Sequence, residues 1–205
     1  MPITPLDPRP ALVVIDLQNG ITALPVVHDI STVIGRAAAL ADAFRAADLP
    51  VVLVTVTGGA PGRSERSLAL AAASVASGQA APVRPADWAD LVPELEGEGI
   101  RVVKRTWGAF HETTLHEQLQ QLGVTQIVFA GISTSKGVET TARAAFEHGY
   151  NVVLATDAMT DSDAAVHANA VENIFPALGE TGTTAEVLAL LRAATAPVAA
   201  DVEVR

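Results

Sequence analysis

Short runs of valine, isoleucine and leucine recur along the chain, separated by segments with the 3.6-residue periodicity of helices. The first run, Ala11 to Leu17, is almost unbroken, which is typical of a strand buried on both faces of a parallel sheet. The other predicted strands are Val51 to Val56, Ile100 to Lys104, Gln126 to Ala130 and Asn151 to Thr156. Strands that alternate with helices predict an α/β fold, with helices on both faces of the sheet.

Helices are predicted between these strands from capping residues and helix-ending glycines and prolines. Ser31 is expected to cap the first helix, and Thr183 with Glu186 forms a capping box for the last, Leu188 to Ala194. The remaining predicted helices lie around Leu91 to Leu95, from Thr113 or Thr114 to Gly123, from Gly137 to His148, and from Asp163 to Phe175.

Thr57 to Ala86 fits this alternation poorly, because it is long for a loop and has glycine or proline at both ends. Ser67 to Ala76 is apolar enough for a short helix that could pack on a second subunit. We expect one domain over residues 1–205, with tails at 1–10 and 197–205.

The charge and cysteine content exclude several classes of function. A net charge of -10, with two lysines in the whole chain, argues against nucleic-acid binding. Cysteine is absent, which excludes disulfides, thiolate metal sites and a cysteine nucleophile. No apolar run is long enough to span a membrane and no signal pattern is present, so we expect a soluble, cytoplasmic protein. The histidine spacing predicts no metal site, and the missing glycine-rich nucleotide motifs predict no cofactor.

Two charged residues stand at the ends of predicted strands. Asp16 follows four apolar residues, and Lys104 follows a pair of valines. In parallel α/β sheets the ligand binds beyond the carboxyl ends of the strands, where these two side chains could meet. The alternatives are an Asp that only caps a loop through the amides of Gln18 and Asn19, and a lysine that reaches the surface.

The segment Gly131 to Val138 leads from a predicted strand into a helix. The free amides at such a helix start suit a carboxylate or an oxyanion. An ordinary turn capped by Ser133, Thr134 or Ser135 is equally compatible with the pattern. The serines do not form the Gly-x-Ser-x-Gly nucleophile motif, and no histidine is placed as an obvious base for them.

Three segments in this order resemble the isochorismatase-like (cysteine hydrolase) family: ALVVIDLQNG at residues 11–20, VVKRTWGAF at 102–110, and FAGISTSKGVETTARAAFEHGYNVVLATDAMTD at 129–161. The resemblance implies a three-layer, Rossmann-like fold with a six-stranded parallel sheet of order 3-2-1-4-5-6, and a homo-oligomer (dimer or tetramer). It also implies an Asp–Lys–Cys triad in the amidase branch and a cis peptide after the loop glycine. Carried over, Asp16 and Lys104 match the first two triad members, Ile132–Ser133 matches the cis bond, and Gly137 takes the place of the cysteine.

Isochorismatases proper also have glycine at the position of the cysteine and hydrolyse a vinyl ether by proton donation from the Asp. The resemblance therefore implies a hydrolase of a small carboxylated molecule, with Asp16 as general acid or base and Lys104 holding a substrate carboxylate or orienting Asp16. Two alternatives stay open, a non-catalytic binding or scaffold descendant and a serine amidase or esterase that uses Ser133 or Ser135. The expected substrate-binding residues are Gln18, Trp107, Phe110, Ile132, Ser133, Thr134, Ser135 and Lys136.

Overall fold

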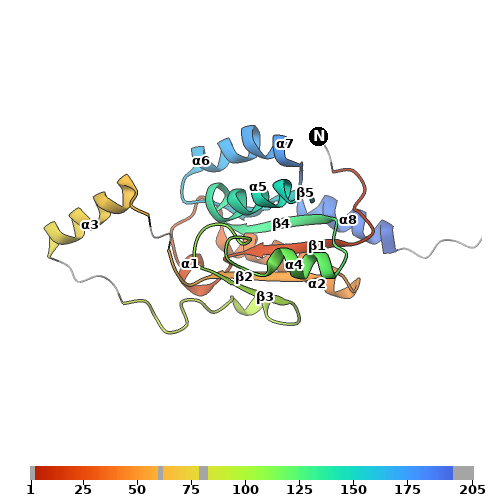
Figure 1. Cartoon of the computed structure of the whole chain (residues 1–205), viewed down its shortest axis with the longest axis horizontal. Coiled ribbons are helices and arrows are strands. Elements are labelled where there is room, and N and C mark those ends of the chain that lie inside the picture. The colour runs from red at the N-terminus through yellow and green to blue at the C-terminus, as the bar shows by residue number, and fades with distance from the viewer. Residues whose placement is uncertain (1–2, 60–61, 79–82, 196–205) are drawn as a thin grey trace, which may run out of the picture.

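The computed structural model describes residues 3–59, 62–78 and 83–195, which form an α/β fold around one parallel sheet (Figure 1). The strand order is β3-β2-β1-β4-β5-β6, as the resemblance implied. The strands are β1 (Pro10–Ile15), β2 (Val51–Val56), β3 (Ile100–Lys104), β4 (Gln126–Ile132), β5 (Asn151–Thr160) and β6 (Glu180–Gly182). The sequence did not locate β6, because this strand is three residues long and lacks an apolar run.

The two central strands define the edge of the sheet at which the candidate site lies. β1 pairs with β2 on one side and with β4 on the other, and all six of its residues are buried. Ile15 is in register with Val54 of β2 and with Gly131 of β4. The residues that follow Ile15 and Gly131 therefore emerge side by side at the carboxyl end of the sheet.

Helices cover both faces of the sheet and enclose two apolar cores. One core contains residues of α4 (Leu115–Gln121), α5 (Glu139–Glu147) and α7 (Phe175–Leu178). The other contains residues of α2 (Ile30–Ala46), the short 3₁₀ helix η1 (Pro93–Leu95) and α8 (Thr184–Thr195). The remaining elements on the body are α1 (Asn19–Thr22), α6 (Ala164–Asn169) and the π-helical turns η2 (Thr134–Val138) and η3 (Ala170–Ile174).

Local capping confirms one prediction and corrects another. The amide of Thr183 donates to Glu186 at 2.7 Å, and the amide of Glu186 donates back to the Thr183 hydroxyl at 3.3 Å, which is the predicted capping box. Asp29, and not Ser31, caps α2, since its carboxylate accepts from the amide of Thr32 at 2.9 Å. The predicted helix around Leu91 to Leu95 is reduced to the single turn η1, because Pro93 starts the turn and leaves little chain before β3.

The long segment after β2 contains a helix, α3 (Glu65–Ser77), over the stretch predicted at Ser67 to Ala76. Figure 1 shows α3 standing away from the body of the molecule, and none of its residues is buried. The predicted tail at 197–205 lies outside the described residues, as do the first two residues of the N-terminal tail. Among the described helices, none combines the length and the apolar character needed to cross a membrane.

Candidate active site

Asp16 directly follows β1 and turns its carboxylate into the carboxyl-end edge of the sheet. Its backbone has a positive φ of 51°, and its amide donates to Val54 O at 2.9 Å. The side chain is buried between neighbouring strand ends, with the residue only 6% exposed. A buried carboxylate needs a partner to offset the loss of hydration.

Lys104, the last residue of β3, is that partner. Its Nζ donates to Asp16 Oδ2 at 2.7 Å and to Trp107 O at 2.8 Å. The lysine side chain is 1% exposed. β2 lies between the strands of the two residues, and the long side chain of Lys104 spans this gap.

Burial and the lysine act on the Asp16 pKa in opposite directions, and burial has the larger effect. Loss of hydration raises the pKa of Asp16 from 3.8 to about 6, against the charge and hydrogen bond of Lys104, which lower it. Lys104 occupies Oδ2, while Oδ1 is buried without a hydrogen-bond partner among the described residues. An unsatisfied buried carboxyl oxygen is uncommon and marks a place where a further group can bind.

The loop after β4 brings its backbone against the same carboxylate. The Ile132–Ser133 peptide is cis, at the bond that the resemblance implied. Gly131 has a φ of +120°, and a Cβ there would lie 2.1 Å from Ile15 O, so a side chain does not fit. A Cβ built at Gly137 would lie 2.9 Å from Ile15 Cγ2 and 3.2 Å from Asp16 Oδ2. The position at which the resemblance places the family's cysteine is therefore next to Asp16.

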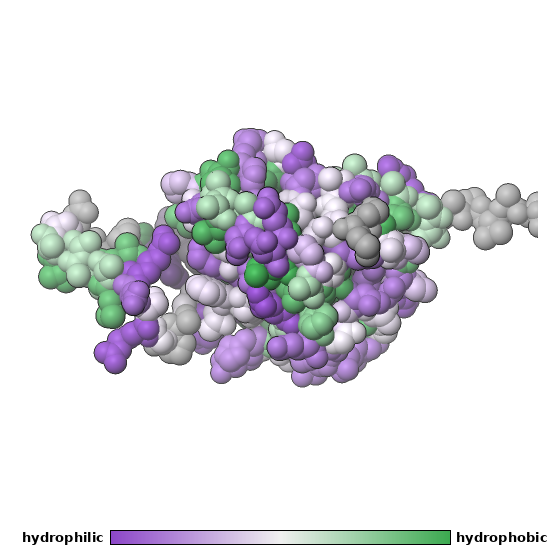
Figure 2. Space-filling model, turned by 90° about the horizontal axis from the view of Figure 1, so that it is seen from above, coloured by the Kyte–Doolittle hydropathy of each residue, from purple (hydrophilic) through white to green (hydrophobic). Residues whose placement is uncertain are grey.

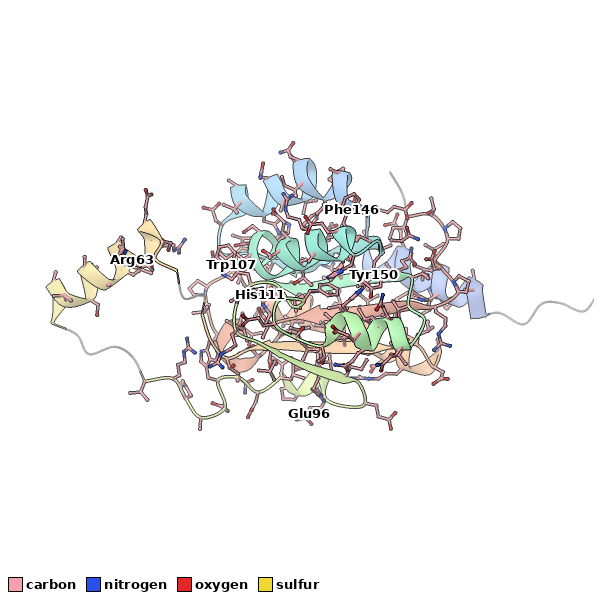
Figure 3. The ribbon with its side chains drawn as sticks, in the orientation of Figure 1. Arg63, Glu96, Trp107, His111, Phe146 and Tyr150 are labelled. Atoms are coloured by element: carbon pink, nitrogen blue, oxygen red, sulfur yellow. The ribbon has the colours of Figure 1, made fainter. Side chains whose placement is uncertain are left out.

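These groups line one cavity of about 240 Å³ at the carboxyl end of the sheet. Of the expected site residues, the cavity lining includes Asp16, Lys104, Trp107, Ile132, Ser133, Lys136 and Gly137. Figure 3 shows Trp107 at the end of the body from which α3 projects, and this ring is 57% exposed. The site is thus open at Trp107 and closed at the Asp16–Lys104 pair.

The cavity is lined by an excess of basic residues in an acidic protein. Arg84, Lys104, Arg105 and Lys136 contribute to the lining, and Asp16 is the one acidic residue among its described members. The chain as a whole has 13 basic residues and a net charge of -10. Such a concentration of positive charge in a concave, partly dehydrated site attracts anions.

Sequence reasoning missed two of the residues that complete the cavity, Arg84 and Trp88. The Arg84 guanidinium donates to Thr57 O at 3.2 Å and lies 4.3 Å from the centre of the Trp88 ring, within range of a cation–π interaction. Both residues come from the stretch between α3 and β3, for which the sequence predicted no strand. An arginine followed four residues later by a tryptophan was the available signal, and it is a weak one.

Two expected binding residues hold the fold together and do not line the cavity. The Gln18 amide donates to Val56 O at 3.0 Å and to Trp88 O at 3.1 Å, and its oxygen accepts from the amide of Val56 at 2.7 Å. The hydrogen bonds of its amide nitrogen and its oxygen thus join the chain near Trp88 to β2. Phe110 packs against His148 and Tyr150, with ring centroids 5.1 and 6.1 Å away, because the chain has turned toward α5 by this point.

Thr134 and Ser135, also expected to bind substrate, lie outside the lining and support the loop from behind. The Thr134 hydroxyl lies 2.9 Å from His167 Nδ1, and the Ser135 amide and hydroxyl donate to Asp161 Oδ2 at 2.8 and 2.7 Å. Burial raises the pKa of Asp161, but the hydrogen bonds from Ser135 and Ser162 and the charge of Lys136 together outweigh it, so that the pKa lies below its usual value. Asp161 is therefore ionised and holds the loop in place.

His167 of α6 is part of this support, through its contact with Thr134. Its ring lies 4.7 Å from that of His28, edge to face. Burial lowers the pKa of His167 below 6.5, and the neighbouring His28 lowers it further. Within residues 3–59, 62–78 and 83–195, no three His, Asp or Glu side chains are grouped so as to hold a metal ion.

Comparisons with known proteins agree with this geometry. A family model described as the isochorismatase domain matches residues 10–186. The uncharacterized isochorismatase family protein YecD of Escherichia coli O157:H7 is 40% identical over 87% of this chain and 94% of its own length. YwoC of Bacillus subtilis, likewise an uncharacterized isochorismatase family protein, is 37% identical over 88% of this chain and 93% of its own. An isochorismatase family structure from Burkholderia thailandensis superposes with a TM-score of 0.79 at 37% identity, covering 92% of this chain and 98% of that one. The chain therefore belongs to the isochorismatase family of hydrolases.

Proposed function

We propose that this protein hydrolyses a small carboxylated molecule by acid–base catalysis from Asp16, with no covalent intermediate at position 137. The observation that carries the proposal is the asymmetry of the Asp16 carboxyl group. Oδ2 is hydrogen-bonded to Lys104 at 2.7 Å, whereas Oδ1 is buried with no partner among the described residues, and Asp16 lines the cavity. A substrate atom is the natural partner for Oδ1.

The pairing with Lys104 decides where a proton on Asp16 resides. Because Oδ2 accepts from the lysine ammonium, the proton of the neutral acid lies on Oδ1, the oxygen that has no partner among the described residues. A pKa of about 6 keeps a useful fraction of the acid protonated near neutral pH. After proton transfer, the Asp16 carboxylate is stabilised by the ammonium of Lys104.

This arrangement suits the hydrolysis of an enol ether that bears a carboxylate. Asp16 protonates the terminal carbon of the double bond, which leaves a positive charge shared by the neighbouring carbon and the ether oxygen. Water then adds to that carbon, and its proton returns to Asp16. Collapse of the adduct breaks the bond between this carbon and the ether oxygen, and the proton of the new hydroxyl passes to the leaving oxygen, so that an alcohol and a keto acid are released. The Asp16 carboxylate, formed in the first step, stabilises the cation by its charge.

The cations of the lining supply the anion-binding part of the site. Lys104 is already bonded to Asp16, so Lys136, Arg84 and Arg105 are the groups that hold a substrate carboxylate. Lys136 Nζ lies 3.9 Å from Asp161 Oδ1, too far for a hydrogen bond, which leaves its ammonium able to donate to a ligand.

Gly137 supports a mechanism without an acyl-enzyme. A glycine has no nucleophile, and the chain has no cysteine to replace it. The Ser135 hydroxyl donates to Asp161, which is ionised and bonded to the loop amide, so this serine faces away from the cavity. Ser133 lines the cavity, but no His side chain belongs to that lining among the described residues. These contacts favour the acid–base mechanism over the serine-hydrolase alternative.

Isochorismate is the first substrate to test, because it is a carboxylated enol ether. We expect turnover by the wild type and a loss of about 10²- to 10⁴-fold in kcat for Asp16→Asn, since the proton donor is removed. Asp42→Asn, on the outer side of α2, controls for the amide substitution. Circular dichroism must show that both variants are folded. Equal rates for wild type and Asp16→Asn would remove Asp16 from the mechanism.

Gly137 also favours a second candidate, a descendant that binds a carboxylated ligand without turnover. A carboxylated ligand that raises the melting temperature but is recovered unchanged would support this function. Labelling of Ser133 or Ser135 by a fluorophosphonate would instead revive the serine mechanism. The three outcomes are distinct, so one set of measurements separates them.

A further inference from the structure

Helix α3 is a regular helix without a place on the body of its own chain. Ser64 caps its start by accepting from the amide of Ser67 at 3.2 Å, and Gly78 ends it in the left-handed conformation. None of its 13 residues is buried. A helix of this length is marginally stable in water by itself, and most helices in proteins are held by an apolar face packed on a neighbour. The structure of α3 therefore calls for a partner surface.

The surface of α3 has the apolar character of a helix face that packs against another protein surface. Residues 67–77 carry no charge, and Leu68, Leu70 and Val75 are 54%, 64% and 82% exposed. Leu68, Ala71, Ala72 and Val75 follow the spacing of one helical stripe, and the alanines allow a close approach. Figure 2 shows the apolar colour gathered along this projecting element. An apolar patch that protrudes in this way marks an interaction site.

In this topology, the helix that connects β2 to β3 would cover these two strands. Another segment of the chain already occupies that position. A right-handed crossover from β2 to β3 covers these strands on the face of α2. Here the segment after α3 does so: the amide of Val92 donates to Leu17 O at 3.1 Å, and Leu95 is fully buried in the core beside α2. α3 is thus an insertion that precedes the crossover segment, so its partner is another molecule.

The charge of the projecting segment that contains α3, here called the arm, indicates which kind of molecule α3 binds. The arm, residues 57–83, carries two arginines, Arg63 and Arg66, and one acid, Glu65, whereas Arg84 packs on Trp88 and lines the cavity of the body. The arm has a formal charge of +1, so that the rest of a chain with net charge -10 carries -11. A basic arm attached to an acidic body is complementary to the body of a second copy. An anionic membrane would repel the acidic body of the protein, and so would a nucleic acid.

We propose that α3 docks on a second copy of this chain, over the acidic segment 87–98 and the edge strand β3, in a reciprocal exchange of arms. Such an exchange places the same two surfaces in contact twice, about a two-fold axis. Figure 3 shows Arg63 on the arm and Glu96 on the body, far apart within one chain, so that their attraction is satisfied between copies.

The receptor combines charge with an exposed apolar strip. Segment 87–98 contains no basic residue, and its five exposed acids are Asp87, Asp90, Glu94, Glu96 and Glu98. Arg101 of β3 donates to Gly97 O at 3.0 Å, which joins this segment to the edge strand. β3 pairs only with β2 in the sheet, and its Val103 is 58% exposed. Arg63 and Arg66 would meet the acids, and the apolar stripe of α3 would cover Val103.

Sedimentation velocity over a range of protein concentrations tests the proposal. We expect the wild type to sediment as a dimer or a larger assembly, and Val75→Glu to raise the dissociation constant about tenfold or more, because a charge replaces a side chain buried in the interface. Val75 is 82% exposed within its own chain, so this variant folds. Val166→Glu is the matched control: Val166 is 41% exposed on α6, and its replacement should leave the assembly unchanged.

A charge exchange then tests the receptor. Arg63→Glu with Arg66→Glu should weaken the assembly, and the addition of Glu94→Lys and Glu96→Lys to the same chain should restore it. Restoration supports the receptor, and its absence overturns that assignment. A wild type that is monomeric at every concentration, or an assembly that Val75→Glu leaves intact, overturns the docking of α3 on a second copy.

Discussion

The pH dependence of turnover follows from the Asp16 pKa of about 6. A general acid acts in its protonated form, so the fraction of active enzyme is about one half at pH 6 and about one hundredth at pH 8. The kcat/KM for an enol ether substrate should therefore fall about fiftyfold between these two values, because kcat/KM reports the ionisation of the free enzyme. Initial rates of pyruvate release, followed in a coupled assay at isochorismate concentrations well below KM, measure the fall.

Lys104→Met tests whether the lysine sets the pH at which the rate falls, that is, the position of the descending limb of the pH–rate profile. The methionine keeps the length of the buried side chain and removes both influences that lower the Asp16 pKa, the charge and the 2.7 Å hydrogen bond. Burial then acts alone, so the pKa rises and the limb moves to higher pH. The plateau rate should fall, because a weaker acid transfers its proton less readily.

Lys136→Met is the matched comparison. Lys136 lines the same cavity but lies beside Asp161, and its charge does not contribute to the Asp16 pKa. The substitution Lys136→Met should raise KM for a carboxylated substrate and leave the descending limb of the pH–rate profile in place. A rate that is constant or rises between pH 6 and 8, or a limb that Lys104→Met moves to lower pH, would refute the assignment of Asp16 as the acid.

Three further outcomes follow from the contacts around the site. Thr141→Val should destabilise the fold by about 1–3 kcal/mol in urea unfolding, because the buried hydroxyl bridges Ala109 N and Gly137 O, and Thr141→Ser should retain most of the stability. Ser135→Ala should keep turnover within an order of magnitude and reduce thermal stability, since Ser135 anchors the loop to Asp161. As pH falls below about 6.5, His167 should contribute a loss of stability, because the folded chain holds its pKa below that of the unfolded chain. Asp16, whose pKa is raised, contributes the opposite change, so the His167 contribution is measured as the difference between the pH–melting curves of the wild type and His167→Gln.

The fold was largely readable because its central strands are buried on both faces. The apolar runs of β1, β2 and β4 coincide with the strands to within one or two residues, since only an apolar run tolerates that environment. β6 was not readable, because a three-residue edge strand with the sequence Glu-Thr-Gly is determined by its pairing with β5. Pairing between distant segments leaves no local pattern in the sequence.

Apart from the resemblance, the sequence predicted the site residues chiefly where a charged side chain follows a buried strand. A charged residue after a buried strand, as at Asp16 and Lys104, carries a desolvation cost that demands an explanation, and the two do meet. Gln18 and Phe110 carry no such cost, and they were assigned to the pocket by their place beside the motifs. The direction of a side chain that follows a strand depends on backbone turns, and these turned Gln18 toward β2 and Phe110 toward β5.

The opposition between burial and Lys104 is what makes Asp16 suitable as an acid. Burial alone would give a carboxyl group with a higher pKa, always protonated near neutral pH but slow to release its proton. A paired carboxylate at the surface would be ionised and have no proton to give. The contact with Lys104 lowers the raised pKa to about 6, close to the pH of use, and also directs the proton to Oδ1. Gly137 belongs to the same design, because a side chain there would begin 3.2 Å from Asp16 Oδ2 and take up space beside the acid. In the proposed mechanism, glycine in place of the family's cysteine and the acid–base role of Asp16 are one change of chemistry at one place.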